Sequence, residues 1–252
     1  MKIIQLIGTR DKSDFALYLA HALTAVKKRV LVLDTTTNEI YRHGYTRLTQ
    51  DKYIYELQQI DILCGVKNWV DAEAKLLQVD EKPDNYDCII LDTDNIQSIL
   101  ADWPKPASTL YLSDSERMNI IRDVPLLHRF LDNRFFDEYN LTELRQVHFE
   151  SSYKLPSDYV LLLMNNRIEF SEESVIIDFD DLAPLLKGKM QHDQIIPYRQ
   201  LSKEYKELLN EIACELFEDL DVRFVGKAAR NSWFSLRPKK VKEEIIGKPI
   251  GG

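Results

Sequence analysis

The chain has 252 residues, of which 44% are hydrophobic, and this length suits one large α/β domain or two small ones. Its formal net charge of −8 excludes a body built around nucleic-acid binding. The three cysteines and five scattered histidines show no metal-ligand spacing and argue against a disulfide framework, so neither a metal site nor an oxidising compartment is expected. Since no signal peptide and no membrane-spanning apolar run is evident, the sequence predicts a cytoplasmic protein.

The chain opens with a strand, a loop and a helix. Residues 3–7 form a short apolar run, and Gly8, Lys12 and Ser13 lie in the loop that follows it. This order of parts is typical of a phosphate-binding loop, in which backbone N–H groups and a lysine contact the phosphates. Asp11 stands where that pattern has a glycine, and its carboxylate would repel phosphate. Alternatively, Asp11 or Ser13 caps the helix that begins near Asp14, and Lys12 is an ordinary solvated lysine.

Further along the chain, short apolar runs alternate with amphipathic stretches. This alternation predicts a doubly wound α/β fold with a mainly parallel sheet flanked by helices. A helix after Pro197 carries an apolar stripe from Leu201 to Leu216 that is expected to pack on the sheet. The predicted strands after the first are Val30–Leu33, Ile60–Val66, Cys88–Leu91, Thr109–Leu112, Tyr159–Met164 and the short Ile195–Ile196.

The composition changes at about residue 223. We therefore divide the chain into an α/β domain, residues 1–222, and a basic C-terminal tail, residues 223–252, with eight basic and two acidic residues. Trp233, Phe234 and Arg237 in the tail are candidates for docking a protein partner, because aromatic and arginine side chains make strong interface anchors. A membrane surface is the second candidate. Alternatively, the aromatic pair folds back onto the domain.

Five segments in this order resemble the MinD/ParA family of P-loop ATPases. They correspond to the family's phosphate-binding loop, the segment after its second strand, its Walker B strand, an adenine-contacting segment and a late Ile-Pro-Tyr motif. The resemblance covers roughly residues 1–220 and implies a P-loop NTPase-like fold. The matching segments are Ile7–Ser13, Val32–Asn38, Tyr86–Thr93, Tyr159–Asn166 and Ile195–Tyr198.

The departures from the family pattern concern its chemistry. Ile7 replaces the signature lysine, Asp11 replaces a loop glycine, and Thr36 replaces the second aspartate after the second strand. Phosphoryl transfer depends on positioning and electrostatic stabilisation, so these losses predict a degenerate site without turnover. The resemblance implies that ATP and Mg²⁺, if they bind, contact the residues that remain. These are Gly8, Lys12, Ser13, Asp34, Asp92 and Asn166.

The resemblance favours a non-catalytic scaffold, localisation or assembly factor for a bacterial machine of the secretion, pilus, conjugation or partition type. Such a factor would be cytoplasmic or held at the inner membrane by its protein partner. The alternative is a slow but genuine partition-type ATPase that binds DNA. A dinucleotide-dependent oxidoreductase is disfavoured, because no G-x-G-x-x-G follows the first strand. Without the signature lysine, we expect a monomer or a dimer that does not depend on ATP, and Ile7 is expected in the core rather than in an interface.

Overall fold

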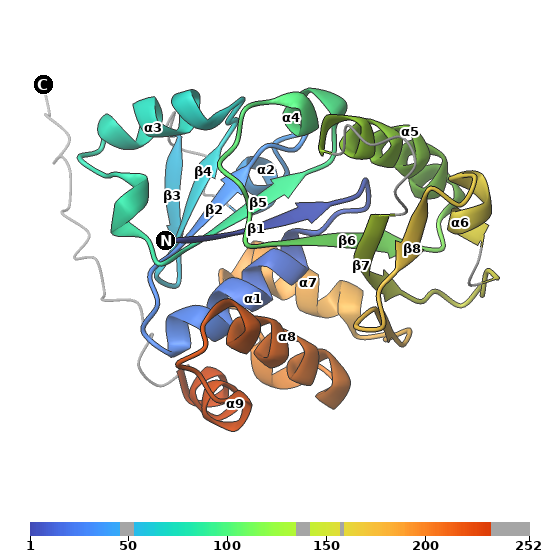
Figure 1. Cartoon of the computed structure of the whole chain (residues 1–252). Coiled ribbons are helices and arrows are strands. Elements are labelled where there is room, and N and C mark those ends of the chain that lie inside the picture. Colours follow the sequence, from blue (N-terminus) through green and yellow to red (C-terminus); the bar gives the residue numbers. More distant parts are fainter. Residues whose placement is uncertain (46–52, 135–141, 157–158, 233–252) are drawn as a thin grey trace, which may run out of the picture.

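The computed structural model describes residues 1–45, 53–134, 142–156 and 159–232, and these residues contain a nine-stranded sheet with helices on both faces (Figure 1). The strand order is β3-β4-β2-β5-β1-β6-β7-β8, with β9 also paired to β7, and every pair is parallel except β3–β4. This confirms the predicted doubly wound fold. The strands are β1 Lys2–Ile7, β2 Val30–Asp34, β3 Ile54–Leu57, β4 Ile60–Cys64, β5 Cys88–Thr93, β6 Ser108–Asp114, β7 Thr142–Phe149, β8 Ile168–Phe170 and β9 Val175–Ile177.

The helices form one layer on each face of the sheet (Figure 1). Alternation along β1 directs Ile4 and Leu6 into the core beneath α1, α7, α8 and α9, while Ile3 and Ile7 enter the cores beneath α3, α4, α5 and α6. None of the helices in the described part is long and apolar enough to cross a bilayer. The helices are α1 Ser13–Ala25, α2 Ile40–Tyr45, α3 Trp69–Leu77, α4 Ile96–Leu100, α5 Arg117–Arg134, α6 Tyr159–Leu163, α7 Ala183–Asp193, α8 Lys203–Leu216 and α9 Val222–Asn231.

Two predicted strands are wrong. Residues 159–164 form α6 and its final turn, with Val160 and Met164 buried four residues apart and Leu162 between them 59% exposed. A short apolar run cannot distinguish a strand from one turn of a helix packed on one side. Residues Ile195 and Ile196 lie in a loop, where the Ile196 N–H donates to the side chain of Gln58 at 3.1 Å rather than to a strand.

The C-terminal helices complete the layer beneath the sheet. The predicted apolar stripe of α8 is buried in the core that this helix shares with α1 and the sheet. The helix α9 packs against α1 and α8 with Val225 and Ala229 buried, so residues 222–231 belong to the folded body and not to a tail. The basic composition of this helix misled the prediction, because its charges lie on the face opposite the buried residues. Trp233, Phe234 and Arg237 lie outside the described residues.

Candidate functional site

The loops at the carboxyl ends of β1, β2 and β5 bring together most of the predicted site residues. Ligands of open α/β sheets bind at this edge. The parallel register pairs Asp34 at the end of β2 with Asp92 near the end of β5, and β1 next to β5 leads directly into Gly8. Lys12 and Ser13 follow at the start of α1.

Lys12 points into the protein. Its ammonium lies 2.9 Å from Asp92 Oδ1 and donates to the Gly8 carbonyl at 2.5 Å, and the side chains of Lys12 and Asp92 are both fully buried. Burial raises the pKa of Asp92, and the charge of Lys12 opposes this shift. The lysine that would reach a terminal phosphate in a working loop is therefore part of an internal ion pair.

Two tyrosines of α2 close over this ion pair and the start of α1. The Tyr41 hydroxyl donates to the second oxygen of Asp92 at 2.7 Å, and the Tyr45 hydroxyl lies 2.8 Å from Ser13 Oγ. Because Ser13 donates its own proton to Asp11, Tyr45 is the donor in this contact. Both tyrosines are almost completely buried.

Asp34 is also fully engaged within the chain. One carboxylate oxygen accepts from the Thr36 backbone N–H at 3.0 Å and from the Thr36 hydroxyl at 2.6 Å, and the other accepts from the Tyr41 N–H at 3.1 Å. Burial raises the pKa of Asp34 to about 7 despite these hydrogen bonds. Thr36, which replaces an aspartate of the family pattern, serves here as a partner of Asp34.

Asp11 accepts hydrogen bonds at the start of α1, in keeping with the capping alternative, but Lys12, which that alternative takes as a solvated lysine, is buried. Its carboxylate accepts from the Ser13 N–H at 3.0 Å and from the Ser13 hydroxyl at 2.6 Å, and its other oxygen pairs with Lys187 of α7. Burial acts to raise the pKa of Asp11, but the Lys187 charge and the Ser13 hydrogen bonds outweigh it, so the pKa is lowered. The charge that replaces a glycine is thus neutralised by a lysine of the same chain.

The other side of the loop is tied to β6 and α5. Gly8 has a φ of 131°, and a Cβ at this position would lie 2.2 Å from the Leu112 carbonyl oxygen of β6. The Thr9 N–H donates to Asp123 Oδ1 at 2.7 Å, and Tyr111 donates to the other oxygen of Asp123 at 2.8 Å. The backbone N–H of Thr9 is therefore used by an internal carboxylate.

Asn166 takes no part in the contacts of these residues. It lies exposed in the turn after α6, in the left-handed conformation with a φ of 55°. Its assignment to adenine depended on a preceding strand, and that segment is a helix packed against α5.

The residues as placed do not fit ATP–Mg²⁺. The ammonium of Lys12, the hydroxyl of Ser13 and the carboxylates of Asp34 and Asp92 all have partners inside the chain, and a nucleotide would have to displace them. In the described ranges, no group of three or more histidine, cysteine, aspartate or glutamate side chains is arranged to hold a metal ion.

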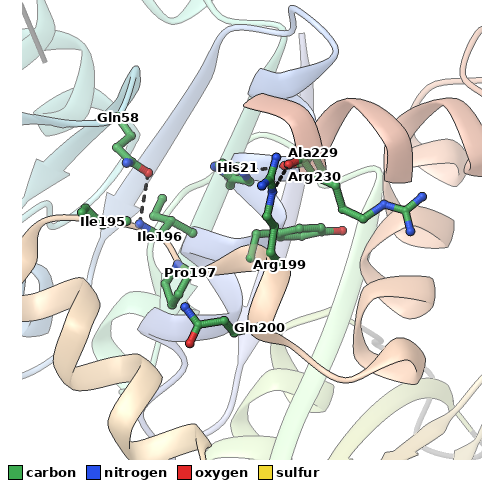
Figure 2. Close-up of a pocket in the computed structure, with 10 residues that line it drawn as sticks. His21, Gln58, Ile195, Ile196, Pro197, Arg199, Gln200, Ala229 and Arg230 are labelled. Carbon is green, nitrogen blue, oxygen red and sulfur yellow. Dashed lines mark hydrogen bonds between the residues drawn. The ribbon is translucent and has the colours of Figure 1, made fainter. Parts of the chain in front are cut away.

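The late Ile-Pro-Tyr segment does not belong to this site and lines a small cavity elsewhere in the chain. Figure 2 shows this cavity of about 20 Å³ between α1, residues 195–200 and the end of α9. It has room for about one water molecule and not for a nucleotide. His21 borders the cavity, and its Nε2 lies 3.1 Å from the carbonyl oxygen of Ala229. Burial lowers the pKa of this histidine to about 4.

The residues that contact the predicted site residues were not identified from the sequence. Tyr41 and Tyr45 are four residues apart in a short segment after Asp34, a spacing that places them on one side of a helix. Lys187 is 176 residues from Asp11, so no local pattern connects them.

No protein-family model matches the sequence, and no curated protein matches it. The chain is similar to the solved structure of the MinD cell division protein of Aquifex aeolicus, with 12% identity over 95% of this chain and 100% of that one and a TM-score of 0.49.

Two further similar structures are of ParA proteins. A ParA family ATPase from Chlorobium tepidum is 10% identical over 91% of this chain and 97% of that one, with a TM-score of 0.49. The pNOB8 ParA bound to nonspecific DNA is 16% identical over 87% of this chain and 99% of that one, also with a TM-score of 0.49. These are the kinds of protein that the sequence motifs resemble. Similarity at this level transfers no activity or ligand to this chain.

Proposed function

We propose that this chain is a non-catalytic, MinD/ParA-like scaffold or localisation factor that acts by binding a protein partner and not by hydrolysing ATP. The observation that carries the proposal is the buried ion pair between Lys12 and Asp92, capped by Tyr41. The side chains needed for phosphate contact stabilise the folded chain instead.

A nucleotide would have to displace interactions that the site residues make within the chain. Withdrawing the Lys12 ammonium leaves Asp92 buried without its counter-charge, and breaking a buried pair in this way costs about 3–5 kcal/mol. The Asp11–Lys187 pair and the Tyr45–Ser13 contact would have to open as well. These costs come before any gain from phosphate contacts, so nucleotide binding is strongly disfavoured.

The partner is a protein of a larger bacterial machine, of the secretion, pilus, conjugation or partition type. This part of the proposal rests on the resemblance of the sequence motifs to MinD/ParA proteins. The factor would be cytoplasmic. Any association with the inner membrane would depend on that partner or on its C-terminal residues 233–252.

ATP turnover by the purified full chain tests the proposal. We expect no Mg²⁺-dependent phosphate release above that of a protein-free control. Lys105→Ala, at an exposed lysine, is the matched control for Lys12→Ala. Turnover that Lys12→Ala abolishes and Lys105→Ala preserves would show that the chain is an ATPase.

The alternative is a slow partition-type ATPase that binds DNA. The observation in its favour is that α9 presents exposed Arg223 and Lys227, and that the sequence after it, residues 233–252, is also basic. Binding to a random-sequence duplex at low salt, lost steeply as salt rises, would support this alternative, because phosphate contacts release counterions. Absence of DNA binding at low salt would favour the scaffold function.

A further inference from the structure

The outward face of α5 combines arginines with apolar side chains. Arg117, Met118, Ile121 and Arg122 are all exposed and lie on one side of the helix, one turn apart, with Met118 64% and Ile121 51% exposed. Neither arginine forms an ion pair with another described residue. We call these four residues the α5 face. Methionine and arginine are enriched in protein interfaces.

A second exposed surface has the opposite charge. Residues 178–185, which lead from β9 into the first turn of α7, contain three aspartates and no basic residue; we call them the acidic segment. Their large apolar side chains are about half exposed, at 53% for Phe179, 49% for Leu182 and 55% for Leu185. The aspartates are Asp178, Asp180 and Asp181.

The two surfaces lie in different helix layers. The helix α5 packs into the core that contains Ile7, whereas α7 inserts Leu186 and Met190 into the core beneath α1 on the other face of the sheet (Figure 1). A single copy therefore cannot bring its own α5 face onto its own acidic segment. Two copies can, because each surface presents apolar side chains together with the charge that the other lacks.

We propose that copies of this chain associate head to tail, with the α5 face of one copy on the acidic segment of the next, in place of the monomer or dimer that the sequence alone led us to expect. A contact between two different patches is heterologous, so it leaves a free patch at each end and extends into a ring or an open chain. The proposal goes beyond the scaffold function and does not depend on it, because neither surface includes the loop residues discussed above. Nucleotide is not required for the contact.

Charge reversal on each surface tests this directly in the full chain. The variants are Arg117→Glu with Arg122→Glu on the α5 face, and Asp178→Arg with Asp181→Arg on the acidic segment. The matched control is Arg223→Glu with Lys227→Glu, which reverses two exposed charges on α9. Sedimentation velocity over a range of protein concentrations gives the association state, and circular dichroism confirms folding.

We expect the wild-type and control proteins to form species larger than a dimer that grow with concentration. Each reversal should weaken this association by about a hundredfold, because like charges across an interface oppose binding strongly. Mixing the two reversal variants should restore assembly, since each presents the charge that the other now needs. Restoration also shows that both variants are folded.

Three results would overturn the proposal. The first is a wild-type monomer, or a closed dimer, at every concentration. The second is a mixture of the two reversal variants that fails to associate. The third is an α5 reversal that leaves self-association unchanged while it abolishes binding to anionic phospholipid vesicles or to duplex DNA, which would assign the α5 face to one of those partners.

Discussion

At the scale of single residues, the feature that matters most is the direction in which Lys12 points. A lysine beside a buried carboxylate contributes to stability, whereas a lysine that faces solvent and awaits a phosphate does not. The two arrangements therefore differ in how much the free energy of unfolding changes when the lysine is replaced.

We expect Lys12→Met to lower the free energy of unfolding by about 3–5 kcal/mol, because it leaves the buried Asp92 without its counter-charge. Urea unfolding followed by fluorescence measures this. The double variant Lys12→Met with Asp92→Asn removes both charges and keeps an acceptor for Tyr41, and it should recover about 2 kcal/mol. A Lys12→Met change within about 0.5 kcal/mol of the wild type, typical of surface sites, would contradict the buried pair.

Asp34 gives a pH-dependent prediction. Its pKa is about 7 in the folded chain and near 3.9 when unfolded, so between these values the folded state holds a proton that the unfolded state has released. The stability contributed by this group is therefore present below about pH 4 and is lost as the pH rises to about 7. Asparagine does not titrate. The destabilisation by Asp34→Asn should thus shrink by about 1–3 kcal/mol between pH 5 and pH 8.

Unfolding of the wild type and Asp34→Asn at both pH values measures this change. The matched control is Asp84→Asn, at an exposed aspartate. A penalty for Asp34→Asn that grows with pH would mean that the carboxylate is stabilised as an anion in the folded state.

At the scale of elements, the sequence predicts the centre of the sheet well and its margins poorly. The strands β1, β2, β5 and β6 are covered on both faces and read as continuous apolar runs. By contrast, β7 is interrupted by polar residues, and β8 and β9 have three residues each, so they leave no comparable pattern. The error at α6 has the same origin, since a run of five apolar residues fits either structure.

For the candidate site, the sequence predicts which residues come together but not which side chains contact them. Gly8, Lys12, Ser13, Asp34 and Asp92 come together because parallel strands end at one edge of the sheet, which the order of motifs predicts. The partners that occupy them depend on tertiary contacts from α2 and α7, which local sequence does not encode.

The boundary of the folded body is testable by truncation. Removing residues 222–252 takes away α9 and exposes the surface that Val225 and Ala229 cover, and a chain that lacks only residues 233–252 is the control. Losing the buried Val225 alone costs about 1.5–3 kcal/mol, and the contact of His21 with the Ala229 carbonyl is lost too. We expect the shorter chain to unfold at a much lower temperature or to aggregate. Equal stability of the two truncations would place α9 outside the body.

At the scale of the whole molecule, a doubly wound α/β fold gathers polar side chains at the carboxyl ends of β1, β2 and β5, and those side chains contact one another. The loop after β1 is held on one side by Asp123 and on the other by α2 and α7.

The most direct test of this account is calorimetric titration of the full chain with ATP and Mg²⁺. We predict no saturable heat up to millimolar ATP, and correspondingly no rise in the unfolding temperature, because a ligand that binds the folded state stabilises it in proportion to its occupancy. The contrary result is saturable, Mg²⁺-dependent binding of ATP that Tyr41→Phe leaves intact and Lys12→Ala removes. In that case the Lys12–Asp92 pair would be a resting arrangement that nucleotide opens, and the chain would be a nucleotide-binding protein.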